Sequence, residues 1–464
     1  MSKRRKHSSD PLEGVVKRHP DGFGFFVPDS TEYPDIYMSR REMTNVMTND
    51  RISIRIVSEK FSDRMRGELV QILKRSTQKV MGQYLRLDEQ RGLLHDRSHA
   101  WGENLIAIRP SHLEIENNDW VLVQINSFPG DPDGFRGEVI SVIGDALDPL
   151  NDAMRVLHKL SIPHEFSTKI LHEAEKIPED LDEKEFRRRV DLREKNLVTI
   201  DGVTAKDFDD AIFVEVTKLG FHLIVAIADV SHYVKSGSAL DIEAFDRGTS
   251  VYFPNFVSPM LPEVLSNDLC SLRPRIPRLA LVADMNFDFS GNMLRAEFYE
   301  AAIESRARIT YGEAQEIVEG NCPRQLEHVK EMVLRAADLA KVFFAKRQRE
   351  GSLDIEIPET EIEVDEAGQP IDIIRADRLF SHRLIEEMML AANVAVAKYF
   401  HAKEIPALYR IHEPPAADSI EELEKYLGAF GFSKGLRGGK LQKKMSHALE
   451  HFVGQPQEQI LHIL

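Results

Sequence analysis

The sequence predicts a multidomain α+β protein in which two small β-barrels precede a larger α/β domain. Residues 12–75 and 76–147 each read as a series of short strands separated by turn signals, a pattern typical of small barrels. From residue 192 onward, apolar strands are mixed with long helical patterns, which is typical of an α/β domain. A chain of 464 residues is long enough for two to four such domains.

The composition predicts a globular protein that does not cross a membrane. Hydrophobic residues make up 42% and charged residues 29% of the chain, and no apolar run approaches the roughly 20 residues that a membrane span needs. Cys270 and Cys322 show neither a metal-ligand spacing nor a disulfide framework, which predicts a reducing, cytoplasmic location. The net charge of −16 argues against indiscriminate nucleic-acid binding. A local basic groove or a metal-assisted site is compatible with it, because binding follows charge distribution.

Residues 1–11 are predicted to form a basic, disordered arm. The segment MSKRRKHSS carries its charge without an apolar core behind it, so it is not a secretory signal. Two roles stay open for this arm, contact with phosphates or service as a solubilising tail.

The first barrel region carries an aromatic cluster. Its strands are expected at residues 14–16, 22–27, 35–38 and 51–57. Phe23 and Phe25 fall on one face of the second strand, and Tyr37 could lie beside them on the third. Exposed rings next to the basic residues 17–19 would form a stacking platform for single-stranded bases. The alternative is that these rings belong to the barrel core.

This region resembles a cold-shock domain, a five-stranded OB-type barrel. The GFGF strand at residues 22–25 and the DIYM strand at 35–38 match the two nucleic-acid-binding motifs of that domain. The second barrel region has its clearest strands at residues 80–85, 120–125 and 137–142, and it lacks the aromatic motif. A role as an RNA binder and a role as a spacer are both open for it.

Residues 148–191 are predicted to form a helical bridge. Phe166, Ile170, Leu171 and Ala174 recur at helical spacing before Pro178 ends the pattern. In the domain that follows, we expect strands at residues 198–200, 211–216 and 223–228, helices at 325–350 and 380–402, and a hairpin around Gly368. Residues 223–228 are apolar throughout, which is typical of a strand buried on both faces.

Four aspartates, Asp201, Asp207, Asp209 and Asp210, are crowded between two of these strands. Carboxylates at this density repel each other unless a cation lies among them, and oxygen ligands suit Mg²⁺. Two such ions would stabilise the attacking and the leaving oxygen in phosphodiester hydrolysis. A tight loop is needed to bring all four side chains together, and Gly202 gives one flexible point. The alternative is a solvated, Asp-rich turn.

The motifs of this domain resemble the signatures of the ribonuclease II and ribonuclease R (RNB) family. In chain order they are residues 201–211 (DGVTAKDFDDA), 225–234 (VAIADVSHYV), 247–254 (RGTSVYFP), 259–272 (PMLPEVLSNDLCSL), 382–393 (HRLIEEMMLAAN) and 408–415 (LYRIHEPP). The two barrel regions match the paired cold-shock domains of that family. The resemblance implies two OB-type, cold-shock-like barrels followed by an α/β RNB nuclease domain.

The resemblance also implies a function. Members of the family are processive 3′→5′ exoribonucleases that hydrolyse single-stranded RNA to nucleoside 5′-monophosphates in RNA turnover. The four aspartates would be the Mg²⁺-binding and catalytic set. Tyr252 matches a tyrosine that stacks on the 3′-terminal base, the alternative being an ordinary strand aromatic. Glu386 matches an acidic residue at the terminal nucleotide; the alternative is a solvated helix face, and Glu387 beside it leaves the register open. Ile355 stands where the family usually has a second stacking residue, Phe.

The family pattern continues past Leu464 with an arginine motif near the scissile phosphate, where it would stabilise developing charge, and with a C-terminal OB-fold domain. We therefore expect a nuclease domain that is incomplete at its C-terminus. The chain is expected to be a monomer unless a separate chain supplies the missing segment. A non-catalytic or partner-dependent RNA-binding fragment is the alternative function, and an unrelated metal-dependent phosphatase is a third. His232 and His412 are interpreted as structural, because metal-bound water needs no histidine base.

Overall fold

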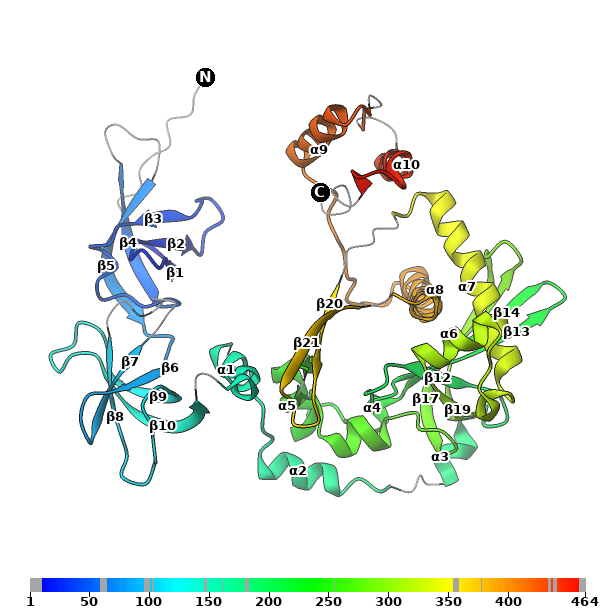
Figure 1. Cartoon of the computed structure of the whole chain (residues 1–464), viewed down its shortest axis with the longest axis horizontal. Coiled ribbons are helices and arrows are strands. Elements are labelled where there is room, and N and C mark those ends of the chain that lie inside the picture. Colours follow the sequence, from blue (N-terminus) through cyan, green and yellow to red (C-terminus); the bar gives the residue numbers. More distant parts are fainter. Residues whose placement is uncertain are drawn as a thin grey trace. The chain divides into compact units, whose positions relative to one another are not determined.

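The computed structural model describes residues 11–58, 65–95, 101, 104–145, 148–160, 162–179, 183–254, 256–353, 359–376, 378–432, 435–436 and 440–458. The arm expected at residues 1–11 lies outside them except for Pro11, and so does Ile355. The chain forms two compact units. Unit 1 comprises Met1–Glu165, Tyr252–Ser258 and Val364–Ile371, and unit 2 comprises Phe166–Val251, Pro259–Glu363 and Asp372–Leu464. Figure 1 labels the elements of both.

The first barrel of unit 1 is closed, with strand order β1-β2-β3-β5-β4. Its strands are β1 (Leu12–Arg18), β2 (Gly24–Pro28), β3 (Ile36–Met38), β4 (Arg51–Ser58) and β5 (Met65–Lys74). On β2 the side chain of Phe26 is buried and that of Phe25 is exposed, because neighbouring residues of a strand face opposite ways. The residue before them is a glycine, Gly24, because a Cβ at this position would lie 2.8 Å from the Sδ atom of Met43.

The second barrel of unit 1 is also closed, with strand order β10-β8-β7-β6-β9. Its strands are β6 (Lys79–Arg86), β7 (Arg91–His95), β8 (Leu105–Ile108), β9 (Asp119–Ser127) and β10 (Arg136–Asp145). The sequence indicated β6, β9 and β10 but not β7 and β8. Gly92 on β7 makes room for the buried ring of Tyr84, since a Cβ there would lie 2.2 Å from that ring. Two closed five-stranded barrels confirm the predicted N-terminal architecture.

Short helices follow the barrels, as the sequence predicted for the bridge. Unit 1 holds η1 (Pro149–Asn151) and α1 (Asp152–Lys159), and unit 2 begins with α2 (Thr168–Glu175) and α3 (Glu183–Arg188). Ile170 and Ala174 are the buried residues of α2, as their spacing predicted, whereas Leu171, predicted on the same face, is exposed. The helix ends at Glu175, three residues before Pro178.

A seven-stranded mixed sheet forms the centre of unit 2, in the order β11-β18-β17-β14-β13-β12-β19. The strands are β11 (Val190–Asp191), β12 (Val198–Asp201), β13 (Asp210–Thr217), β14 (Gly220–Ala228), β17 (Pro277–Asp288), β18 (Met293–Glu304) and β19 (Ala307–Thr310). The pairs β11–β18 and β12–β19 are parallel. On β14, Leu223 and its three successors are fully buried, which confirms the predicted strand buried on both faces. Ile227, near its end, is exposed.

Helices pack on this sheet and complete the core of unit 2. They are α6 (Tyr311–Glu319), α7 (Lys330–Glu350) and α8 (Phe380–Ala402); α7 contacts β13, and α8 contacts β14 and β17 (Figure 1). The bounds of α8 are those predicted. Helix α7 begins five residues later than predicted, because the 3₁₀ helix η3 (Arg324–Leu326) precedes it. The predicted hairpin is formed by β20 (Thr360–Val364) and β21 (Pro370–Arg375), with Gly368 at φ 81°.

Shorter elements lie between β14 and β17. They are α4 (Val230–Tyr233), α5 (Ala239–Arg247), the strand pair β15 (Val251–Tyr252) and β16 (Val257–Ser258), and a π-helix, η2 (Val264–Leu269). The strand pair belongs to unit 1 apart from Val251, and the three helices belong to unit 2.

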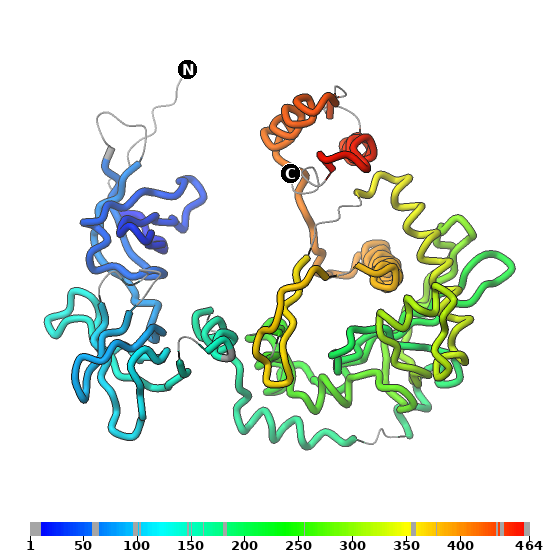
Figure 2. Tube along the Cα trace, viewed as in Figure 1, coloured from blue at the N-terminus to red at the C-terminus, as the bar shows by residue number. Residues whose placement is uncertain are grey.

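The last two helices, α9 (Ala417–Ala429) and α10 (Leu441–Phe452), have a small core of their own. Its buried residues are Leu427, Phe432, Leu436, Ala448 and Phe452. Residues 403–416 connect α8 to α9 without regular structure and are almost all exposed; Figure 2 shows this connection as an orange trace. Leu408 and Ile411 lie in it with fully or largely exposed side chains. The sequence also predicts a helix over residues 457–464, most of which lies outside the described residues.

Candidate functional site

The four aspartates lie around the loop between two central strands of unit 2. Asp201 is the last residue of β12 and Asp210 is the first residue of β13, while Asp207 and Asp209 lie in the connecting loop. Both strands are paired on the sheet, β12 with β19 and β13 with β14. The loop turns at Gly202, whose carbonyl accepts a 3.3 Å hydrogen bond from the backbone amide of Ala205. The sheet therefore fixes both ends of the acidic loop, residues 201–210.

Burial and mutual repulsion raise the pKa values of three of these carboxyl groups, those of Asp201, Asp209 and Asp210. Burial, and then the charges of Asp209 and Asp207, raise the pKa of Asp201 to about 6. Burial and the charges of Asp209 and Asp201 raise the pKa of Asp210 to about 7. The pKa of Asp209 is also raised, by loss of solvent around its carboxyl group and then by Asp207, although its side chain reaches the surface. The structure thus brings the four carboxylates into one electrostatic field.

Two carboxylate oxygens of this cluster fit a cation. Oδ2 of Asp201 and Oδ2 of Asp210 are buried and make no hydrogen bond among the described residues. A buried carboxylate without a partner is costly, and a hard divalent cation with oxygen ligands would offset that cost. Across the described part of the chain, no three His, Cys, Asp or Glu side chains are already gathered as a ligand set. The carboxylate ligands and these two buried oxygens therefore fit a hard divalent cation.

Two further residues lie at the acidic cluster and were not indicated by the sequence motifs. Arg308, on β19, opposes the upward pKa shift of Asp201. The pKa of Tyr311, at the start of α6, is raised by burial and then by the charges of Asp201 and Asp210. A sequence signal existed for Tyr311, because Thr310 and Glu313 form a capping box that fixes where α6 begins. No local signal marks Arg308, since its position follows from the pairing of β19 with β12.

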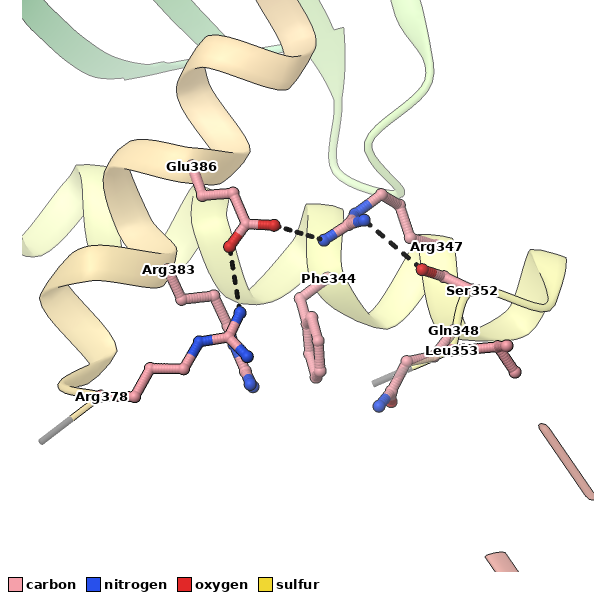
Figure 3. Close-up of a pocket in the computed structure, with 8 residues that line it drawn as sticks. All are labelled: Phe344, Arg347, Gln348, Ser352, Leu353, Arg378, Arg383 and Glu386. Carbon is pink, nitrogen blue, oxygen red and sulfur yellow. Dashed lines mark hydrogen bonds and ion pairs between the residues drawn. The ribbon is translucent and has the colours of Figure 1, made fainter. Parts of the chain in front are cut away.

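Glu386 lines a pocket of about 150 Å³ at the facing surfaces of α7 and α8. Figure 3 shows its carboxylate between Arg378, at 3.1 Å, and Arg347, at 3.7 Å. Glu387 is buried and pairs with Arg347 through contacts of 2.5 and 3.1 Å. Glu387 therefore joins the two helices through Arg347, while Glu386 faces the pocket. The other lining residues are Phe344, Gln348, Ser352, Leu353 and Arg383.

The remaining predicted RNA-binding residues belong to unit 1. Phe23, Phe25 and Tyr37 form one ring cluster, with centroid distances of 5.6–6.3 Å. Phe25 and Tyr37 are 40% and 38% exposed, so these rings are not part of the barrel core. Tyr252, on β15, is 62% exposed.

Of the basic residues predicted beside the rings, His19 lies next to them and Arg18 does not. His19 extends the cluster, since its ring stacks on that of Phe23 with centroids 4.2 Å apart. Arg18 turns away from the rings, because its guanidinium donates to the backbone carbonyls of Met43 and Val46.

The two histidines interpreted as structural lie in different settings. His232, in α4, is 3.7 Å from Glu185, and burial lowers its pKa. His412 lies in the exposed connection before α9, where its Nδ1 atom is 2.8 Å from the carbonyl oxygen of Glu413. Neither contact involves an aspartate of the acidic loop.

Three protein families match the chain, each over a different part. The RNB domain matches residues 189–464, the Ribonuclease B OB domain matches 14–72, and the Cold shock domain matches 103–167. Among the described residues, no helix has the length and apolar character needed to span a membrane.

Individual relatives match almost the whole chain. Ribonuclease R of Aquifex aeolicus is 34% identical over 98% of this chain and 64% of its own length, and that of Thermotoga maritima is 35% identical over 98% and 65%. The solved structure of Mycoplasma genitalium RNase R in complex with ribose methylated single-stranded RNA aligns with a TM-score of 0.86 at 28% identity, covering 97% of this chain and 72% of that one. The chain thus spans about two thirds of the length of these curated relatives. With the RNB domain matched over more than half of its residues, the chain belongs to the RNB family of ribonuclease R relatives.

Proposed function

We propose that the chain is a processive 3′→5′ exoribonuclease that hydrolyses single-stranded RNA to nucleoside 5′-monophosphates. The observation that carries this proposal is the acidic loop, which lies in a domain that matches the RNB family. Two buried carboxylate oxygens of this loop make no hydrogen bond to any residue that the structure describes. Support also comes from the relatives, which are named Ribonuclease R. The similar Mycoplasma genitalium RNase R, solved in complex with ribose methylated single-stranded RNA, adds to it. RNA degradation is the corresponding cellular role.

Asp201 and Asp210 are the proposed core of a Mg²⁺ site, completed by Asp207 and Asp209. Bound there, Mg²⁺ would lower the pKa of a water and offset charge on the phosphodiester. The carboxylates would themselves hold the ion, and those not bound to it directly would orient water and the scissile phosphate. Because burial and repulsion disfavour adjacent negative charges, a bound cation would stabilise the charged forms of these carboxylates.

Tyr252, in unit 1, and Glu386, in unit 2, are each proposed to be an RNA-binding residue. An exposed aromatic ring offers a face for base stacking, and a carboxylate accepts hydrogen bonds from ribose hydroxyls. Upstream nucleotides would stack on the exposed ring cluster of Phe23, Phe25 and Tyr37. Ring stacking tolerates any base sequence, which suits an enzyme that moves along RNA.

A cytoplasmic location and a monomeric state are part of the same proposal. Both cysteines are free thiols, which fits a reducing compartment.

Cleavage of end-labelled RNA tests this function. With 5′-labelled single-stranded RNA and Mg²⁺, the chain is expected to shorten the substrate stepwise from its 3′ end, and with 3′-labelled RNA it should release labelled mononucleotide. Asp209→Asn should reduce cleavage at least about 100-fold while RNA binding in EDTA persists. Asp246→Asn, on the exposed face of α5, is the matched control and should cleave normally. Binding without cleavage by the unaltered chain would instead identify an RNA-binding fragment.

A further inference from the structure

The acidic loop is held by residues that come from distant parts of the chain. Ser271, which follows the π-helix η2, is buried next to it. Its hydroxyl accepts a hydrogen bond from the amide of Phe208 at 3.1 Å and donates one to the carbonyl of Lys206 at 2.9 Å. The amide of Leu272 donates to the carbonyl of Phe208 at 2.7 Å. One hydroxyl thus uses both its donor and its acceptor capacity on backbone groups on either side of Asp207.

The segment that carries Ser271 is itself fixed. In the π-helix the amide of Cys270 donates to the carbonyl of Leu265 at 2.8 Å. Arg278 is buried, and its guanidinium donates to the carbonyl of Ser271 at 3.1 Å and to Asp268 at 2.7 Å. Single π-helical turns are frequent at functional sites. The segment that places Ser271 against the loop is therefore held by its own hydrogen bonds.

Arg308 holds the opposite end of the loop. One of its terminal nitrogens donates to the carbonyls of Gly202 and Val203 at 2.7 and 2.8 Å. Its guanidinium carbon lies 5.6 Å from the centre of the Phe208 ring. Gly202 directly follows Asp201, and Phe208 separates Asp207 from Asp209, so the held positions are direct neighbours of three of the four aspartates.

We propose that Ser271 and Arg308 are positioning residues that set the spacing of the four carboxylates. This inference rests on the proposed function only for its kinetic consequence. Catalytic groups must be held to within about 0.5 Å of their productive positions, and a shift of about 1 Å can cost about 100-fold in rate. Loss of the loop contacts of either residue should therefore lower kcat. The affinity for RNA, and hence KM, should stay nearly unchanged.

The experiment combines hydrogen exchange with steady-state kinetics on the full chain. In Ser271→Ala, without divalent ions, amides of residues 203–210 should exchange faster while the rest of unit 2 is unchanged. With Mg²⁺, kcat should fall about 10- to 100-fold with KM within about twofold. Ser271→Thr keeps the hydroxyl and should restore both. Ser305→Ala is the matched control, since Ser305 is equally buried and donates to the carbonyl of Ala307, outside the loop.

Arg308→Met should have the same two effects, with partial recovery in Arg308→Lys, whose ammonium still donates. Arg306→Met is its control, because Arg306 donates to the carbonyl of Arg193 instead. These variants decide the question if Ser271→Ala does not fold. Unchanged exchange at residues 203–210 in folded variants overturns the proposal, and so does a rise in KM without a fall in kcat. If the unaltered chain cleaves no RNA, the proposed function fails, while the exchange measurements still decide whether these residues hold the loop.

Discussion

A buried ion pair between Arg189 and Asp229 connects the start of β11 to the end of β14. The atoms are 2.6 Å apart, and both side chains are almost inaccessible to solvent. Asp229 also accepts hydrogen bonds from the Ser231 hydroxyl and the His232 amide. Its pKa is lowered, because these hydrogen bonds and Arg189 outweigh the effect of burial, which alone would raise it.

Removing one member of this pair should be strongly destabilising. Asp229→Ala leaves a buried guanidinium without its partner and should lower the free energy of unfolding by about 3–5 kcal/mol, measured by urea denaturation. Asp191→Ala breaks the exposed pair with Arg193 and should cost at most about 1 kcal/mol. An equal decrease in the free energy of unfolding in the two variants would contradict this account.

His222 makes stability depend on pH. It lies between Asp284, at 2.8 Å, and Glu215, at 2.9 Å, and hydrogen bonding to these carboxylates raises its pKa. Because the folded-state pKa is above the unfolded value of about 6.5, the stabilisation is fully present below that pH. It is lost as the pH rises through the folded-state pKa.

The corresponding variant is His222→Gln. The free energy of unfolding should differ from that of the unaltered chain more at pH 6 than at pH 9, in denaturation series at both values. Asp284→Asn removes the larger cause of the shift and should flatten the pH dependence of the unaltered chain. A difference for His222→Gln that is constant with pH would show that the imidazolium is not stabilised.

At the scale of elements, Arg75 joins the two barrels of unit 1. It pairs with the buried Asp50 of the first barrel at 2.7 Å and donates to the carbonyl of Pro129 in the second at 2.9 Å. Burial raises the pKa of Asp50, and Arg75 opposes that shift. One guanidinium thus pairs with a buried carboxylate and connects two closed sheets.

Arg75→Ala should therefore loosen both barrels. The unpaired carboxylate of Asp50 should lower the stability of unit 1 by about 3 kcal/mol, seen as a lower Tm of its transition in calorimetry. Faster exchange is expected at the junction, at the amides of residues 45–50 and 128–131. Arg91→Ala breaks an exposed pair with Asp88 and serves as the control. A Tm equal to that of the control would exclude a structural role for the junction.

Elements were predictable from sequence where the signal is local. Helix α8 has the predicted ends because a long apolar periodicity defines it, and β14 is recognisable from a continuous apolar run. Strands β7 and β8 are short, and Gly92 makes sense only once the ring of Tyr84 is known to lie over it. The acidic loop was also recognisable from a local signal, because its four aspartates lie close together in the sequence. Ser271 and Arg308 were not, because they meet it only through tertiary contacts across more than 60 residues.

At the scale of the whole molecule, the proposed RNA binding would depend on local surfaces, since the chain carries a net charge of −16. The double variant Phe25→Ala/Tyr37→Ala should weaken binding by about 1–3 kcal/mol per lost stacking contact, measured by fluorescence anisotropy with single-stranded RNA. KM should rise while kcat stays near its original value, the reverse of the effect expected for Ser271→Ala. Phe245→Ala removes an 85% exposed ring elsewhere and should leave affinity unchanged. Loss of kcat alone would contradict a binding role for the rings.

The connection between α8 and α9 has an evolutionary consequence. Residues 403–416 are almost all exposed and join a helix pair that has its own small core. Lengthening such a surface connection costs little, because loop entropy grows only slowly with length. Insertions and deletions should therefore accumulate here among descendants of this gene, while the length of the acidic loop, tied down at both ends, stays constant.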